Sequence, residues 1–218
     1  MRTKLTILNA ALIAAGLAVG PSLNMGPAGD VETTHCTAGG AERGTPELTA
    51  GELCEAMGGP LSLARYQQLL GPLTKALELS DATTPDRMAM WLAQVAHESG
   101  GLRYMEELAD GSQYEGRLDL GNTEPGDGKR FKGRGPIQVT GRHNYTAFSS
   151  WAHRQGLSPT PTWFVDRPQE LASDRYGFYG AVWYWTVAKP HINALCDAGD
   201  LVGVTKAING GLHGFDDR

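Results

Sequence analysis

Apolar residues recur at helical spacing along much of the chain, and the pattern is clearest in one segment. Thr84 followed by Pro85 is a typical helix start, and Gly100 followed by Gly101 is a typical helix end. The pattern between them predicts a helix over residues 85–99. The apolar residues at i, i+3, i+4 and i+7, which share one face of that helix, are Met88, Trp91, Leu92 and Val95.

Similar signals predict further helices. These cover residues 49–57, 63–77, 142–154, 174–187 and 200–208. Thr49 and Glu52 form a capping box in the first, and Pro72 is expected to break or kink the second. Between residues 110 and 141 the helical period is lost, and glycine and charged residues are frequent. We expect a long irregular region there, with a short hairpin near residues 130–139, in a mainly α (α+β) fold.

The N-terminal part of the chain has a different character. An apolar stretch at residues 5–20 follows two basic residues, which is typical of an export signal. The stretch is shorter than the roughly 20 residues that a membrane span needs, so a weak, releasable membrane anchor is the alternative. We therefore expect a signal-like or anchor segment at residues 1–28, with transient membrane contact through its apolar stretch. A linker rich in Gly, Pro, Thr and Ala follows at residues 29–47, and the folded domain occupies residues 48–218.

Composition narrows the classes of partner and cofactor. The chain has 24 acidic residues against 19 Lys and Arg, a net charge of −5, and no basic block that would bind nucleic acid. Its cysteines are Cys36, Cys54 and Cys196, and no C-x-x-C pair occurs, which argues against a cysteine-bound zinc ion. Cys54 and Cys196 fit the core, and one disulfide can form if the protein is exported. We predict a monomer that uses no metal and no cofactor.

Glu98 is the strongest candidate for chemistry. It lies at the end of the helix predicted over residues 85–99, close to Trp91 and Val95 on the edge of the apolar stripe. Partial burial and the negative end of the helix dipole both disfavour its charged form, as a general acid requires. A metalloprotease helix would need a second histidine where Gly101 stands, so that alternative is excluded.

A second carboxylate is needed if the protein is an inverting glycosidase. The two carboxyl groups of such enzymes are roughly 6.5–9.5 Å apart, which leaves room for a water molecule. Glu115 is notable because Tyr114 and Gly116 flank it in the irregular region, but spacing alone does not select it. The candidates are Glu106, Glu107, Asp110, Glu115, Asp119, Glu124 and Asp127.

The glycine-rich stretch 133–141 is the next dense cluster. It lacks the third glycine of a dinucleotide-binding loop and the lysine of a P-loop. In an extended strand, Gln138 and Thr140 would lie on one face. An amide and a hydroxyl so placed suit the acetamido and hydroxyl groups of a sugar, or a bound water. The alternative is a tight structural turn.

Four segments together resemble one known family. They read AHESGG (96–101), YEGR (114–117), LGNTEPGDGKRFKGRGPIQVTGRHNY (120–145) and INGGLHGFDDR (208–218). In this order they are similar to the catalytic domain of family 19 glycoside hydrolases, and the similarity covers residues 48–218. Within the family, the sequence resembles bacterial members and bacteriophage endolysins, especially those of phages that infect mycobacteria and related actinobacteria.

The resemblance implies a fold and a set of site residues. The fold is a lysozyme-like bilobal domain, mainly helical, with a catalytic cleft and a loop-rich insert that can hold a small β structure. Glu98 matches the general acid, Glu115 the general base, and Thr140 a residue that holds the attacking water. Arg218 matches an arginine near the acid and the base, and Asn209 matches an asparagine that contacts sugar or water. The positions that match other substrate-binding residues are Gln138, Asn144 and Tyr145.

The activity that the resemblance implies is inverting, metal-free hydrolysis of β-1,4 bonds in polymers of N-acetylated amino sugars. Similarity to endolysins favours cell-wall peptidoglycan, and chitin is the other substrate. Two alternatives stay open, a non-catalytic protein that binds cell-wall glycan and a lytic transglycosylase. The export-like segment predicts a secreted or envelope-directed protein, whereas a phage lysin would await a holin in the host cytoplasm. Family members usually continue into a further helix after Arg218, so the domain is expected to be cut short there.

Overall fold

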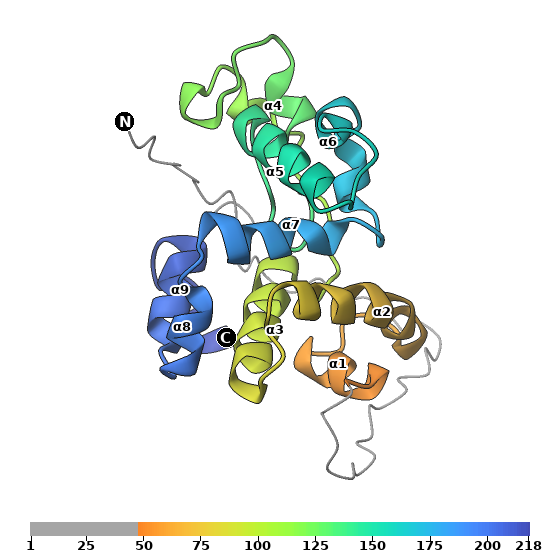
Figure 1. Cartoon of the computed structure of the whole chain (residues 1–218), viewed down its shortest axis with the longest axis vertical. Helices are drawn as coiled ribbons and strands as arrows, with labels where there is room; N and C mark the ends of the chain where they lie inside the picture. Colours follow the sequence, from red (N-terminus) through yellow and green to blue (C-terminus); the bar gives the residue numbers. More distant parts are fainter. Residues whose placement is uncertain (1–47) are drawn as a thin grey trace, which may run out of the picture.

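Short helices joined by turns make up residues 48–218, the part of the chain that the computed structural model describes (Figure 1). The helices are α1 (Ala50–Ala56), α2 (Leu63–Leu79), α3 (Pro85–Ser99), α4 (Asp127–Arg130), α5 (Arg142–Arg154), α6 (Trp163–Asp166), α7 (Gly177–Trp183), α8 (Ile192–Asp197) and α9 (Leu201–Asn209). Single turns accompany them at η2 (Ser112–Tyr114), η3 (Leu118–Leu120), η4 (Pro168–Ala172) and η6 (Phe215–Asp217), and η5 (Tyr184–Ala188) is π-helical. The predicted export segment and linker, residues 1–47, lie outside the described residues. Within residues 48–218, no helix has both the length and the apolar character that crossing a membrane requires.

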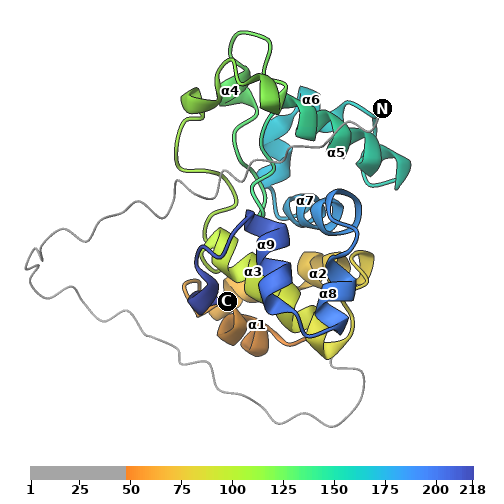
Figure 2. The same cartoon turned by 90° about the vertical axis from the view of Figure 1, so that its left-hand side faces the viewer.

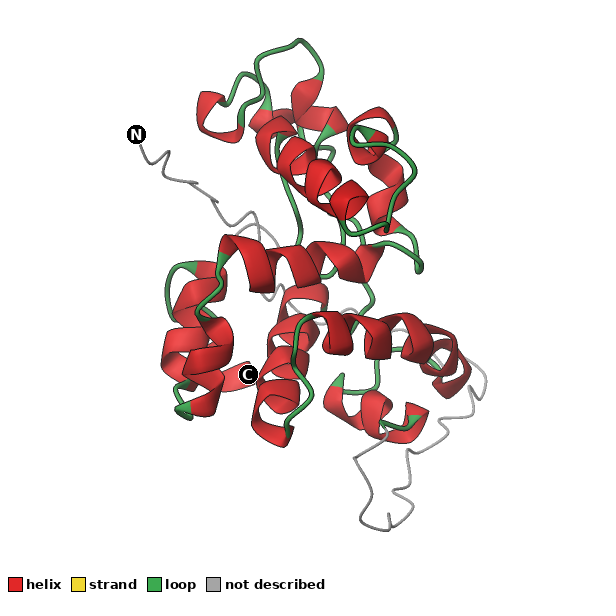
Figure 3. Ribbon diagram, viewed as in Figure 1, coloured by secondary structure: helices red, strands yellow, loops and turns green. Residues whose placement is uncertain are grey.

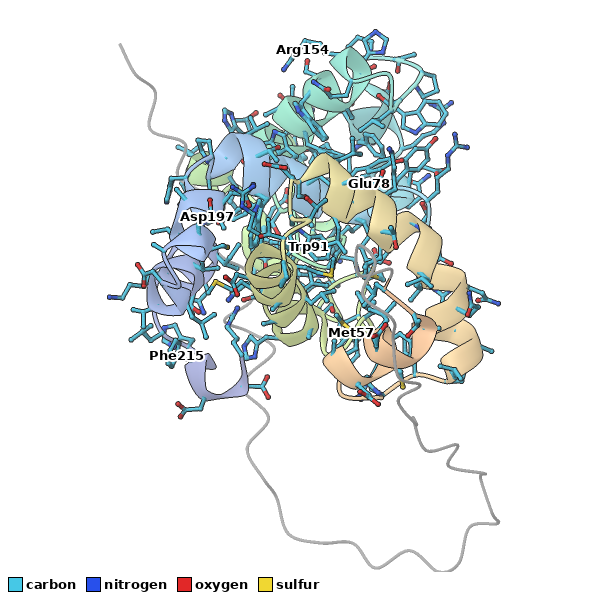
Figure 4. The ribbon with its side chains drawn as sticks, turned by 60° about the horizontal axis from the view of Figure 1, so that its bottom comes forward. Met57, Glu78, Trp91, Arg154, Asp197 and Phe215 are labelled. Carbon is cyan, nitrogen blue, oxygen red and sulfur yellow. The ribbon has the colours of Figure 1, made fainter. Side chains whose placement is uncertain are left out.

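The helices form two groups with α7 between them (Figures 1 and 2). One group contains α1, α2, α3, α8 and α9, and the other contains α4, α5 and α6. Helix α7 packs against α2 on one side and α5 on the other, so it joins the two groups. Trp91 of α3 lies inside the first group (Figure 4), and Phe148 of α5 packs edge-on against Trp183 of α7. The mainly helical, two-part arrangement agrees with the prediction from the sequence.

Local sequence explains where the first helices start and stop. Thr49 and Glu52 form the predicted capping box, each bonding the backbone of the other. Thr84 caps α3, and Gly100 ends it in the left-handed conformation with a φ of 58°. Pro72 does not break α2, which continues to Leu79 as one helix. The apolar face of α2 stays buried on both sides of the proline, and this packing outweighs the lost backbone hydrogen bond.

The predicted hairpin near residues 130–139 does not form strands. Only isolated bridges join Arg134 to Glu106 and to Val139, and the described chain contains helices and loops alone (Figure 3). Gly135 and Gln138 both have positive φ values, 75° and 54°, which turn the backbone before a ladder can extend. The irregular chain runs from α3 along one side of the molecule to α4 (Figure 2).

Two cysteines lie in the described part of the chain. Both are buried, as the sequence predicted. Cys54 is disulfide-bonded, whereas Cys196 is free, and burial raises the pKa of its thiol to about 11. A thiol with so high a pKa reacts poorly near neutral pH. Cys36 lies outside the described residues.

We expect Asp127→Asn to destabilise the second group of helices by about 2–3 kcal/mol at neutral pH. The Asp127 side chain is 1% exposed and pairs with Arg142, with 2.7 Å between its Oδ2 and Arg142 Nε. This bond lowers the pKa of the carboxyl group. The contribution is therefore complete above the unfolded value of about 3.9 and is lost as pH falls through the lowered value.

Thermal melts at pH 7 and pH 3 measure this effect. The gap between the wild type and the variant should be wide at pH 7 and narrower at pH 3. Asp86→Asn, at an exposed position in the first turn of α3, is the matched control and should change stability by less than about 1 kcal/mol. An equal gap at both pH values would show that the Asp127 charge does not contribute.

Candidate active site

The Glu98 side chain is buried at the end of α3 and paired with Arg218. It is 3% exposed, and the Arg218 side chain is 1% exposed. One guanidinium nitrogen of Arg218 donates to Glu98 Oε1, and another donates to Gln94 Oε1 one turn earlier on the same helix. Among residues 48–218, no hydrogen bond reaches Glu98 Oε2. Oε2 is therefore the oxygen of this carboxyl group that is open to a further hydrogen-bond partner.

The burial that the sequence predicted for Glu98 is present, but its surroundings are not purely apolar. The guanidinium of Arg218 lies against one oxygen of the carboxyl group, a charged partner that the apolar stripe does not predict. Periodicity could not predict this contact, because 120 residues separate the two partners. The resemblance predicted Arg218 near the acid and the base, and the structure places its guanidinium against Glu98.

The chain before Arg218 is fastened to the same end of α3. Asp217 Oδ2 lies 2.6 Å from Nδ1 of His97. Asn209, predicted to contact the sugar or a water, donates from Nδ2 to the backbone oxygen of His213 and accepts from the backbone N–H of Gly211. These bonds use both ends of its amide in the turn after α9. In this structure Asn209 shapes the turn that leads the chain back to α3.

The Glu107 carboxylate, a few residues after α3, is held by several neutral donors. Its Oε1 accepts from Gln113 Nε2 and from the Tyr114 hydroxyl, both at 2.9 Å, and its Oε2 accepts from the Gly133 N–H at 3.1 Å. The backbone is held as well, because the Glu107 N–H donates to the Gly133 oxygen and Lys132 Nζ donates to the Glu107 oxygen. Within the described residues, no Lys or Arg forms an ion pair with this carboxylate.

Glu106 faces other partners. Its Oε1 lies 2.9 Å from Arg134 Nε and 3.4 Å from Lys132 Nζ. Successive side chains of an extended segment point to opposite sides, which separates Glu106 from Glu107. Glu106 is therefore paired with two cations, whereas the donors to the Glu107 side chain are neutral.

Glu115, predicted to be the base, is exposed and bonded to a loop. Its Oε1 accepts from the Gly126 N–H at 2.6 Å, and its Oε2 accepts from the Gly128 N–H at 2.9 Å. A side chain on Gly128 would come within 2.6 Å of the Glu115 nitrogen, so the two segments touch closely. These contacts are those of a residue that holds the loop before α4.

Gln138 lies beside Glu107 and not on an extended strand. Its positive φ removes the strand on which it was predicted to share a face with Thr140. The side chain is fixed by a 2.8 Å bond from Nε2 to the Gly135 oxygen. A methyl group at Gly133 would lie 2.6 Å from Gln138 Oε1 and 3.3 Å from Glu107 Oε2, so both oxygens border one small space. Thr140 is buried and donates from its hydroxyl to the Gln138 backbone oxygen at 2.8 Å.

Known proteins with similar sequence identify the family. A protein of Haemophilus influenzae described as a glycosyl hydrolase family 19 domain-containing protein is 30% identical over 178 residues, covering 67% of this chain and 82% of its own length. The chain belongs to glycoside hydrolase family 19. This family 19 glycoside hydrolase is also 35% identical over 124 residues to an endochitinase of Arabidopsis thaliana, covering 57% of this chain and 39% of the plant protein. The chain thus spans about two fifths of that relative.

A solved structure has the same fold. Chitinase C from Streptomyces griseus HUT6037 superposes with a TM-score of 0.56 at 21% identity, covering 78% of this chain and 83% of that one. The predicted mainly helical, lysozyme-like fold of this family 19 glycoside hydrolase is thereby confirmed. No family model matches the chain.

Two residues predicted to bind substrate in this family 19 glycoside hydrolase are buried. Tyr145 is 0% exposed, and its hydroxyl donates to the Lys132 oxygen and accepts from Arg134 Nη1. Asn144 is also buried and donates to the Thr140 oxygen. Both side chains bond to residues 132–140 and help to hold that segment in place, and their roles in substrate binding stay predictions. Helical spacing could have shown the burial of Tyr145, which shares the buried face of α5 with Phe148.

The described residues of this family 19 glycoside hydrolase contain no group of three or more His, Cys, Asp or Glu side chains that could hold a metal ion. The residues that the sequence reasoning did not single out are Gln113 and Tyr114, whose donors face Glu107. Tyr114 had been noted only as a neighbour of Glu115. Its hydroxyl partner lies seven residues away in an irregular segment, where no periodicity applies.

Proposed function

We propose that this glycoside hydrolase cleaves β-1,4 bonds between N-acetylated amino sugars with inversion, using Glu98 as the acid and Glu107 as the base. The observation that carries the proposal is that the Glu107 carboxylate is held by three neutral donors and keeps room on Oε2 for one more partner. A positioned, ionised carboxylate with a free lone pair is what the activation of water requires.

The neighbouring segments support Glu107 over Glu115. Glu107 follows α3 after a short stretch of turns, in which the Tyr104 N–H bonds the Ser99 oxygen at the helix end. Gln138 Nε2 approaches the Tyr104 oxygen from the other side, at 3.5 Å. Glu107 is thus tied to the end of the helix that carries the acid, whereas Glu115 is tied to the loop before α4.

The proposed reaction has one step. Glu98 gives its proton from Oε2 to the glycosidic oxygen as the bond from that oxygen to C1 breaks. A water molecule forms the new bond to C1 from the opposite face and gives a proton to Glu107 Oε2. The products are two shorter chains, an ionised Glu98 and a protonated Glu107, which then exchange protons with solvent.

The Arg218 contact fits an acid that must cycle between two charge states. The guanidinium holds Oε1 and leaves Oε2 free, which fixes the direction in which the proton leaves. It also stabilises the carboxylate that forms once the proton has been given away. Gln94 holds the other arm of the guanidinium and so keeps it in place.

We propose peptidoglycan as the preferred substrate, with chitin as the second. Both polymers carry β-1,4 bonds next to N-acetylated sugars, so one acid–base pair serves both. Support for chitin comes from the relatives named endochitinases, and support for peptidoglycan comes from the motifs shared with endolysins.

Products from purified cell-wall sacculi and from chitin oligomers test the substrate. We expect mass spectrometry to find hydrolysed sugar ends from both, with faster release from sacculi. Products lighter by one water would identify a lytic transglycosylase, and binding without any product would identify a glycan-binding protein. Faster release from chitin than from sacculi would reverse the preference.

We also propose that the protein is exported. The signal-like pattern at residues 1–28 supports this, and so does the disulfide at Cys54, because disulfides persist in oxidising compartments. Fractionation of expressing bacteria should find the protein outside the cytoplasm. Recovery of all of it from the cytoplasm with reduced cysteines would favour release through a holin.

A further inference from the structure

The Glu107 carboxylate is bonded asymmetrically. Each carboxylate oxygen can accept about two hydrogen bonds. Oε1 accepts two, from Gln113 Nε2 and the Tyr114 hydroxyl, whereas Oε2 accepts one, from the Gly133 N–H. Oε1 therefore accepts as many hydrogen bonds as it can, and Oε2 can accept one more. Oε2 borders the space that it shares with Gln138 Oε1.

The Tyr114 hydroxyl is held in position by the irregular segment. Tyr114 is 4% exposed, and its backbone oxygen accepts from the side-chain amide of the fully buried Asn122 at 2.8 Å. The Tyr114 N–H donates to the backbone oxygen of Gly111. Gly111 packs closely against Gly128, because a methyl group added to Gly111 would lie 2.5 Å from the Gly128 oxygen. Glu115 binds the Gly128 N–H and closes this contact. The loop that was expected to supply the base thus fixes a tyrosine that touches another carboxylate.

The chemistry of Tyr114 suits a permanent donor. Burial and the bond to the Glu107 carboxylate both raise the pKa of the phenol. The hydroxyl therefore stays protonated over the range in which glutamates titrate, and it donates to the ionised form of Glu107. Gln113 is exposed, so its bond to the same oxygen competes with water and contributes less.

We infer that Tyr114, assisted by Gln113, is a positioning residue that fills Oε1 of Glu107 and so makes Oε2 the atom that takes the proton from water. The inference rests on the proposed role of Glu107. Tyr114 touches neither substrate nor water in this arrangement and acts through the carboxylate alone.

Tyr114→Phe tests the inference through kcat, KM and the pH profile. We expect kcat on chitin oligomers to fall about tenfold or more, with KM changed less than about twofold. The acidic limb of the kcat profile should move to higher pH, because the carboxylate loses one of the donors that stabilise its charged form. Gln113→Leu should move the same limb in the same direction by a smaller amount.

Tyr66→Phe is the matched control. It removes the same atom from another buried tyrosine, whose hydroxyl donates to the Gly101 oxygen at 3.0 Å. We expect a comparable fall in melting temperature and no movement of the acidic limb. An equal movement of the limb in Tyr66→Phe would show that lost stability, and not the bond to Glu107, causes the effect.

Glu107→Gln, measured alongside, separates failure of the inference from failure of the proposed function. If Glu107→Gln is inactive while Tyr114→Phe keeps wild-type kcat and an unmoved limb, the inference alone is wrong. If Glu107→Gln is fully active, the base is elsewhere and the inference is wrong with it. If Tyr114→Phe does not fold, the kcat profile of Gln113→Leu tests the inference in its place. An acidic limb that does not move in that variant overturns the inference.

Discussion

Glu98→Gln is expected to abolish hydrolysis, lowering kcat by at least about a thousandfold. Glutamine is nearly isosteric, and its amide oxygen can still accept from Arg218. It has no proton to give to the glycosidic oxygen, so the leaving sugar must depart as an alkoxide. Substrate binding, measured by calorimetry with chitin oligomers, should remain within a few-fold of wild type.

Stability must be measured with the same variant, because the change leaves the Arg218 charge without a counter-charge in a buried site. We expect a lower melting temperature and a folded protein. Glu55→Gln, the same chemical change at an exposed position of α1, should keep both activity and stability. A Glu98→Gln variant with even a tenth of wild-type turnover would remove Glu98 from the role of acid, since that loss is only about 1.4 kcal/mol.

Glu107→Gln is expected to lower kcat by about a hundredfold to ten-thousandfold. The amide can no longer take a proton from water. Its one oxygen can still accept hydrogen bonds from the donors that hold the carboxylate, which belong to Gln113, Tyr114 and Gly133. The acidic limb of the pH profile should disappear with the carboxylate. Steady-state rates on chitin oligomers between pH 3 and pH 9 measure both effects.

Glu115→Gln is the matched comparison, because both residues were candidates for the base. We expect it to keep activity within about fivefold and to lose about 1–2 kcal/mol of stability, since its amide group cannot accept from both Gly126 and Gly128. The reverse outcome, an inactive Glu115→Gln beside an active Glu107→Gln, would return the role to Glu115.

Local rules predicted much of the first helical group. The Thr84–Pro85 start, the apolar stripe and the Gly100 stop gave α3 nearly to the residue, because each depends on neighbours within one or two turns. The hairpin was wrong because Gln138 adopts a positive φ that its residue type does not favour. Contacts within the folded chain, such as the hydrogen bond from Gln138 Nε2 to the Gly135 backbone oxygen, hold that conformation in place.

The site was predictable as a set of residue types but not as a geometry. Glu107 was among the candidate carboxylates, yet only the backbone of Gly133 and the turn at Gln113 and Tyr114 show which way it faces. Motif similarity predicted site roles for Glu115 and Tyr145, and those roles stay predictions; in the structure the side chain of Glu115 bonds a loop and that of Tyr145 bonds Arg134. A motif records which residues occur together and does not separate those that touch substrate from those that support them.

The central claim is that water, activated by Glu107, attacks the sugar directly while Glu98 protonates the leaving group. Proton NMR of the first-formed product, recorded before the anomers equilibrate, tests it most directly. With a β-linked chitin oligomer as substrate, direct attack from the opposite face predicts that the new reducing end appears first as the α-anomer. A new end that appears first as the β-anomer would contradict the account, because retention requires a second displacement at C1.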